Sequence, residues 1–97
     1  MAGFLFPIKK LKISGHSMEP ILKNGDIVLI NRLAYVFSSP KKGDIIAAKI
    51  NKKVFIKRIT KIDNNKFFLC GDNQKDSLDS RKFGLISKKD IIGKVIS

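Results

Sequence analysis

Short apolar runs separated by polar turns recur along the whole chain. β-Branched residues dominate these runs, and no window shows the 3.6-residue period of an amphipathic helix. The pattern predicts seven short strands and therefore an all-β fold, a small barrel-like coiled sheet in a single domain over residues 1–97. The expected strands cover residues 10–14, 27–30, 45–50, 54–60, 67–70, 83–87 and 91–96.

The polar segments between the runs carry turn residues. Asn24-Gly25-Asp26 precedes residues 27–30, whose unbroken apolar character is typical of a strand buried on both faces. Asn51-Lys52-Lys53 separates two predicted strands and predicts a hairpin. Residues 35–42, with Ser38-Ser39-Pro40, are expected to form a loop.

The strand predicted over residues 54–60 places a lysine between apolar neighbours. Because alternate side chains of a strand share a face, Phe55, Lys57 and Ile59 should lie together. Burial disfavours the ammonium form and lowers the pKa of a lysine, so that Lys57 could act as a general base. Arg58 cannot do so, because a guanidinium stays protonated. The alternative is an ordinary lysine whose charged end reaches solvent, as is common in Lys-rich chains.

A candidate nucleophile lies in Gly15-His16-Ser17-Met18-Glu19-Pro20. A serine hydroxyl needs a neighbouring base to react. His16 is the only histidine, and as the residue next to Ser17 in extended chain it points to the other side, which argues against a Ser-His-Asp triad. The Ser-Lys variant remains, with Lys57 as the base. Met18 is expected in the wall of the site or in the core.

A third polar stretch runs from Gly71-Asp72-Asn73 through Ser77-Leu78-Asp79-Ser80-Arg81 to Gly84. Its short polar residues suit a tight loop. A calcium-binding EF-hand loop is the sharper alternative, but Ser77 stands where that loop needs glycine and Phe83 where it needs glutamate. We therefore expect neither a metal nor a cofactor.

Together the three segments resemble the signal peptidase I family of serine-lysine endopeptidases. Members share, in this order, a Ser-Met pair before a proline, a Lys-Arg pair in a strand, and a Gly-Asp-Asn…Ser-x-Asp-Ser-Arg…Gly box. The few residues between Lys57 and Gly71 leave no room for the domain that some relatives insert there, so the chain resembles a minimal catalytic core.

The resemblance implies roles for individual residues. Ser17 matches the nucleophile, Lys57 the general base and Ser77 the serine that orients the lysine, while the Ser17 amide matches an oxyanion-hole donor. Some members have a serine as second donor where this chain has Gly15. Asp79 and Arg81 match an ion pair, and Asp72 and Asn73 a structural turn. The residues expected to shape the site are Gly15, Met18, Pro20, Arg58, Asp72, Asn73, Asp79 and Arg81.

The implied activity is cleavage after small residues in an extended segment of a precursor polypeptide, which adds as a strand to a sheet edge. Alternatives are a soluble maturation peptidase of the nickel superoxide dismutase processing type and an inactive basic β-domain that binds membrane or nucleic acid. The self-cleaving repressor branch related to LexA also uses Ser and Lys, but it lacks the Ser-x-Asp-Ser-Arg box.

Composition bears on partners and location. The net charge of +12 suggests peripheral contact with an anionic membrane, whereas the scattered lysines and the absence of a binding motif argue against specific nucleic-acid recognition. The apolar patch at residues 3–8 is too short to span a bilayer. Membrane association, peripheral or through an anchor outside this chain, is expected, with a cytoplasmic location as the alternative. Cys70 is expected in the core.

Overall fold

Seven antiparallel strands form one sheet in the part of the chain that the computed structural model describes, residues 7–73 and 85–96. No α-helix lies in these residues, so the all-β prediction is confirmed. The elements are β1 (Ile8–Lys12), β2 (Ile27–Asn31), β3 (Ile45–Ile50), β4 (Lys53–Asp63), β5 (Lys66–Cys70), β6 (Ile86–Ser87), the short 3-10 helix η2 (Lys88–Asp90) and β7 (Ile91–Val95).

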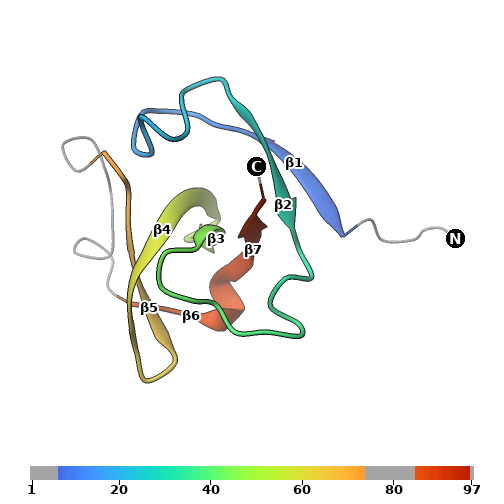
Figure 1. Ribbon diagram of the computed structural model, residues 1–97, viewed down its shortest axis with the longest axis vertical. Coiled ribbons are helices and arrows are strands. Elements are labelled where there is room, and N and C mark those ends of the chain that lie inside the picture. Colours follow the sequence, from blue (N-terminus) through green and yellow to red (C-terminus); the bar gives the residue numbers. More distant parts are fainter. Residues whose placement is uncertain (1–6, 74–84, 97) are drawn as a thin grey trace, which may run out of the picture.

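The order of strands in the sheet differs from their order in the chain. It runs β1-β2-β7-β3-β4-β5-β6, so β7 pairs with β2 on one side and with β3 on the other. β1 and β6 are the two edges, and the sheet is curled without closing into a barrel (Figure 1). β4 bends most strongly, and its two halves pair with different neighbours along much of their length (Figure 1).

Two tight turns shape the β3-β4-β5 meander. Asn51 and Lys52 join β3 to β4 with φ of 50° and 69°, and Asn64 and Asn65 join β4 to β5 with φ of 49° and 63°. Successive positive φ values are those of the two-residue hairpin turn whose twist matches paired strands, and asparagine tolerates them. The hairpin predicted before Lys57 is confirmed.

The core consists of two apolar clusters, and β4 contributes to both. Ile59 lies fully buried in the larger cluster, whereas Ile56, which alternation places on the opposite face, packs against the smaller one. Cys70 is buried, as predicted. The larger cluster contains Tyr35, Ile46, Ala48, Ile59, Phe67, Leu69 and Ile86, and the smaller contains Ile13, Met18, Leu22 and Val28.

Two expectations about the first strands were wrong. β1 begins at Ile8 and ends at Lys12, earlier than the predicted residues 10–14. β2 is not buried on both faces, since Val28 and Ile30 are each 1% exposed but Ile27 is 63% exposed. β2 lies next to the edge strand β1, where the core covers only one face of the sheet, so the apolar run gave no sign of which face is open.

A tyrosine-aspartate bond fixes the segment between β2 and β3. Tyr35 Oη donates to Asp44 Oδ2 at 2.7 Å, and the Lys41 amide donates to the same oxygen at 3.0 Å. Burial and the bond to Asp44 raise the pKa of Tyr35. Burial acts to raise the pKa of Asp44 as well, but the donors Tyr35 and Lys41 and the nearby Lys94 outweigh it and lower that pKa. The predicted loop is thus tied to the start of β3.

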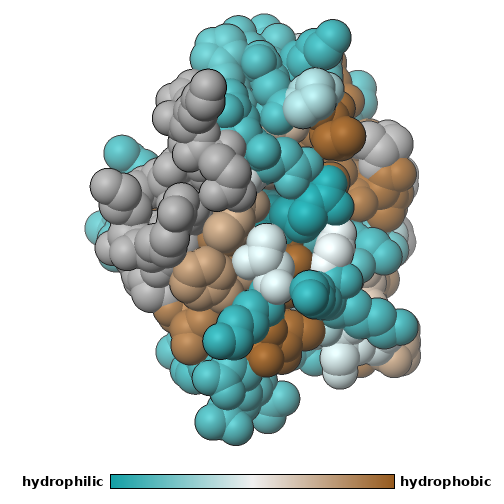
Figure 2. All heavy atoms as spheres, turned by 60° about the vertical axis from the view of Figure 1, so that its left-hand side comes forward, coloured by the Kyte–Doolittle hydropathy of each residue, from teal (hydrophilic) through white to brown (hydrophobic). Residues whose placement is uncertain are grey.

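The side of the molecule that Figure 2 brings forward has a mixed surface of hydrophilic and hydrophobic residues. Figure 2 shows polar residues over much of this side, with separate apolar patches between them. Val54 and Ile62 of β4 are among the large apolar side chains exposed to solvent. Within the described ranges, no helix has the length and apolar character needed to cross a membrane.

Candidate active site

Lys57 lies inside the molecule. The residue is 2% exposed, and no other charged residue in the described ranges is buried. Its partner across the β3-β4 pair is Ile46, which is fully buried, and alternation along β4 puts Ile59 on the same face. The predicted burial of Lys57 among apolar neighbours is confirmed, and the surface alternative is wrong.

Ser17 lies in a turn that follows β1. The Glu19 amide donates to the His16 carbonyl at 3.1 Å, which closes the turn around the serine. Gly15 has a φ of 95°, in the region that favours glycine, and its amide donates to Asn24 Oδ1 at 2.9 Å. The Glu19-Pro20 peptide is cis.

The structure brings Ser17 and Lys57 to one cavity of about 130 Å³. One wall comes from the end of β1 and the segment after it, and the other comes from the first half of β4. Met18 is 1% exposed and belongs both to the cavity wall and to the smaller core cluster, as expected. The lining residues are Leu11, Lys12, Ile13, Ser14, Ser17, Met18, Val54, Phe55, Ile56 and Lys57.

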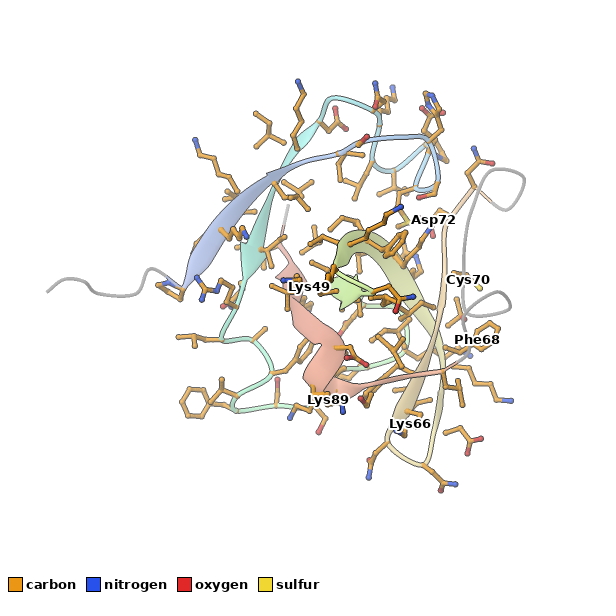
Figure 3. All side chains as sticks on the ribbon, turned by 180° about the vertical axis from the view of Figure 1, so that it is seen from behind. Lys49, Lys66, Phe68, Cys70, Asp72 and Lys89 are labelled. Carbon is orange, nitrogen blue, oxygen red and sulfur yellow. The ribbon has the colours of Figure 1, made fainter. Side chains whose placement is uncertain are left out.

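The residue after Lys57 forms a two-pronged ion pair. Arg58 Nε and Nη2 donate to the two carboxylate oxygens of Asp72, each at 2.8 Å, and Nη1 donates to the Gly43 carbonyl at 2.9 Å. The bond to Asp72 raises the pKa of Arg58, against the opposite effect of burial. Figure 3 shows Asp72 beyond Cys70, where the chain leaves β5. The pair therefore joins the lysine strand to the start of the third segment.

That third segment also contacts the serine turn. The Asp72 amide donates to Met18 Sδ at 3.4 Å. The Asn73 amide donates to the Ser17 carbonyl at 2.7 Å, and Asn73 Nδ2 donates to the His16 carbonyl at 3.1 Å. The three segments singled out in the sequence thus meet at one place.

The outcome for the remaining candidates differs. His16 Nδ1 lies 2.7 Å from Glu19 Oε2, an exposed pair that the sequence reasoning missed although the i, i+3 spacing could have indicated it. The pairing of Arg58 with Asp72 was also missed, since only spatial proximity reveals it. Ser77, Asp79 and Arg81 lie outside the described residues, so their expected roles stay predictions.

The sheet and this meeting of segments define a class of protein. Residues 8–96 match the peptidase S24-like family, and the chain belongs to that family. The resemblance to signal peptidase I is confirmed by individual relatives. The chain is 34% identical over 105 residues to mitochondrial inner membrane protease subunit 1 of Xenopus tropicalis, a match that covers 84% of this chain and 63% of that protein.

Two bacterial relatives are more distant in sequence but are covered more fully. The chain is 24% identical over 143 residues to signal peptidase I of Bacillus caldolyticus, covering 94% of this chain and 79% of the relative. It is 26% identical over 128 residues to inactive signal peptidase IA of Staphylococcus aureus strain MRSA252, and this match covers 86% of this chain and 74% of the relative. Because one relative is named inactive, membership of the family does not by itself decide activity.

Proposed function

We propose that this chain is a serine endopeptidase whose Ser17-Lys57 dyad cleaves a precursor polypeptide after a small residue. The observation that carries the proposal is that Ser17 and the buried Lys57 line the same small cavity. Burial favours the neutral amine of a lysine, the form that can accept a proton. A serine hydroxyl beside such a base meets the requirement for an activated nucleophile.

The reaction follows from these two groups. Ser17 Oγ attacks the carbonyl carbon of the scissile peptide while its proton passes to Lys57 Nζ. The tetrahedral intermediate collapses to an acyl-enzyme, and Lys57 gives the proton to the departing amine. Lys57 then takes a proton from water as the water attacks the ester, and returns it to Ser17. The Ser17 amide is the proposed donor to the negatively charged oxygen of each tetrahedral intermediate.

An extended substrate fits the walls of the cavity. β1 is an edge strand, and β4 pairs with β5 only over Arg58–Asp63 in the described residues, so the first half of β4 has one edge facing the cavity. A substrate strand can add between these edges through main-chain bonds. The apolar side chains Ile13, Met18 and Ile56 and the modest volume favour a small side chain at the cleaved position.

Membrane association is part of the proposal. Its support is the inner-membrane location in the name of the Xenopus relative and the net charge of +12, which favours contact with anionic headgroups. Cosedimentation of the chain with vesicles containing anionic lipid, and its loss in vesicles of neutral lipid, is the expected result. Equal binding to both, or to neither, would contradict this part of the proposal.

The activity is tested with extended peptides that vary the residue at the cleavage position. Wild-type protein should cleave after small residues, and Ser17→Ala and Lys57→Met should each abolish cleavage while keeping the melting temperature within a few degrees. His16→Ala, a neighbour of the nucleophile outside the dyad, is the control and should retain most activity. Activity should rise with pH into the alkaline range, because Lys57 acts as the base after losing its proton.

Two outcomes would overturn the assignment. Cleavage by Lys57→Met, with a rising limb of the pH-rate profile near 4, would indicate a carboxylate base such as Asp72. Absence of cleavage by the wild-type protein across the peptide set would favour the inactive binding domain, an alternative that the name of the Staphylococcus relative keeps relevant.

A further inference from the structure

Asn73 contacts the two peptide groups on either side of the candidate nucleophile. Its side-chain Nδ2 donates to the His16 carbonyl at 3.1 Å, and its backbone amide donates to the Ser17 carbonyl at 2.7 Å. Hence one residue that follows β5 donates to the carbonyls of both His16 and Ser17, in a turn more than fifty positions earlier in the chain.

The first of these contacts bears on the proposed oxyanion-hole donor. The His16 carbonyl and the Ser17 N–H belong to the same peptide group, which is planar and trans, so the two bonds point in opposite directions. Any contact that fixes the direction of this carbonyl also fixes the direction of the Ser17 N–H. The His16 carbonyl accepts from two donors, Asn73 Nδ2 and the Glu19 amide, which restrict rotation of the peptide plane.

Asn73 is itself held in place. The carboxylate of the preceding residue, Asp72, accepts two hydrogen bonds from Arg58, and the Asp72 amide donates to buried Met18. The backbone at Asn73 is therefore held in place, and the direction of its side-chain amide determines the direction of the His16 carbonyl that accepts from it.

We propose that Asn73 is a positioning residue that aims the Ser17 N–H at the oxygen of the tetrahedral intermediate. The inference rests on the proposed function of Ser17 and adds a residue that acts on the donor without touching substrate. An oxyanion-hole donor is effective only when it points to where negative charge develops. A rotated peptide plane therefore reduces the stabilisation of the transition state more than the binding of the substrate in the ground state.

The test compares Asn73→Asp and Asn73→Ala with wild-type protein. Asn73→Asp keeps the shape and the backbone bond to Ser17 but puts oxygen where Nδ2 donates, and Asn73→Ala removes the side chain. Complete loss of an oxyanion-hole donor typically lowers kcat about 100- to 1000-fold, so misalignment should lower it by roughly 10- to 100-fold. KM should stay within about twofold, because ground-state binding is unaffected.

A second measurement separates positioning from a general structural effect. A peptide aldehyde that forms a hemiacetal with Ser17 places its oxygen at the oxyanion position, and its affinity should fall by the same factor as kcat. The rising limb of the pH-rate profile should not move, since Lys57 is unchanged. His16→Ala, which keeps the His16 carbonyl, is the matched control and should retain kcat and aldehyde affinity.

The possible failures are distinguishable. Wild-type cleavage with unchanged kcat in both folded Asn73 variants overturns the inference and leaves the proposed function intact. The inference is also overturned if kcat falls but the rising limb of the pH-rate profile moves, or if kcat falls while the affinity for the peptide aldehyde stays at the wild-type level. A wild-type protein that cleaves nothing, or a Ser17→Ala variant that cleaves normally, overturns the proposed function and the inference together.

Discussion

The Arg58-Asp72 pair should stabilise both the fold and the geometry around Ser17. Replacing either partner removes two charge-assisted bonds of 2.8 Å and leaves the other group partly buried without its counter-charge. The Gly43 carbonyl also loses its donor when Arg58 is replaced. The proposed perturbations are Arg58→Met, Asp72→Asn and the double variant, which together form a double-mutant cycle.

The expected magnitude follows from the geometry and the exposure. Unit charges about 4 Å apart attract by about 4 kcal/mol at an effective dielectric constant of about 20. The two side chains are 31% and 18% exposed, so water screens part of this attraction. After this screening and the loss of side-chain entropy, we expect a coupling free energy of about 1–2 kcal/mol, above the typical surface pair.

Urea unfolding of the four proteins at one pH measures the coupling. The control is the same cycle on His16 and Glu19, whose side chains are 56% and 38% exposed and whose coupling should stay below about 0.5 kcal/mol. The Arg58 and Asp72 single variants should also cleave more slowly, since Asn73 follows the disturbed residue. A coupling no larger than that of the control pair would refute the structural role assigned here.

Three further predictions concern other residues. Asp44→Asn should be less stable than wild-type protein above about pH 4, where the Asp44 carboxylate is ionised. The difference should shrink at lower pH, because the pKa of Asp44 is lowered and the carboxylate loses its contribution only on protonation; urea midpoints from pH 2 to 6 measure this, and a constant difference would contradict it. Gly93→Ala should cost about 1–3 kcal/mol, because the added methyl group would meet the Asn31 carbonyl and lie 2.8 Å from Ile30 Cγ2; an unchanged melting temperature would be incompatible with this packing. Ser77→Ala should lower kcat by roughly 10- to 1000-fold if Ser77 orients Lys57, whereas Ser80→Ala should be milder, and equal mild effects on kcat would remove Ser77 from the catalytic set.

The strands and the candidate dyad were predictable because they depend on local pattern. β-Branched runs and turn residues locate the strands to within a few positions, and alternation along β4 is enough to place Lys57 beside Ile59. The positive φ values at Asn51 and Lys52 agree with the turn expected there.

What the sequence left open depends on tertiary neighbours. The apolar run of β2 could not reveal that Ile27 faces solvent, because that depends on the position of β2 beside an edge strand. Likewise, Arg58 and Asp72 lie fourteen positions apart on different elements, and no local signal pairs them. The contacts of Asn73 with the serine turn span more than fifty positions and follow only from the folded sheet.

The position of β7 has a consequence for when the proposed site can assemble during synthesis. β7 is the last strand of the described chain, yet it joins β2 to β3 in the interior of the sheet. Ser17 lies in the segment between β1 and β2, on one side of β7 in the sheet, and Lys57 lies in β4, on the other side. A ribosome-bound chain that lacks residues 91–95 contains both Ser17 and Lys57, but it lacks β7, the strand that pairs with β2 and with β3. We therefore expect the two residues of the proposed dyad to come together late, because contacts between segments distant in sequence are slow to form. A chain that stops before residue 91 is expected to lack the proposed peptidase activity.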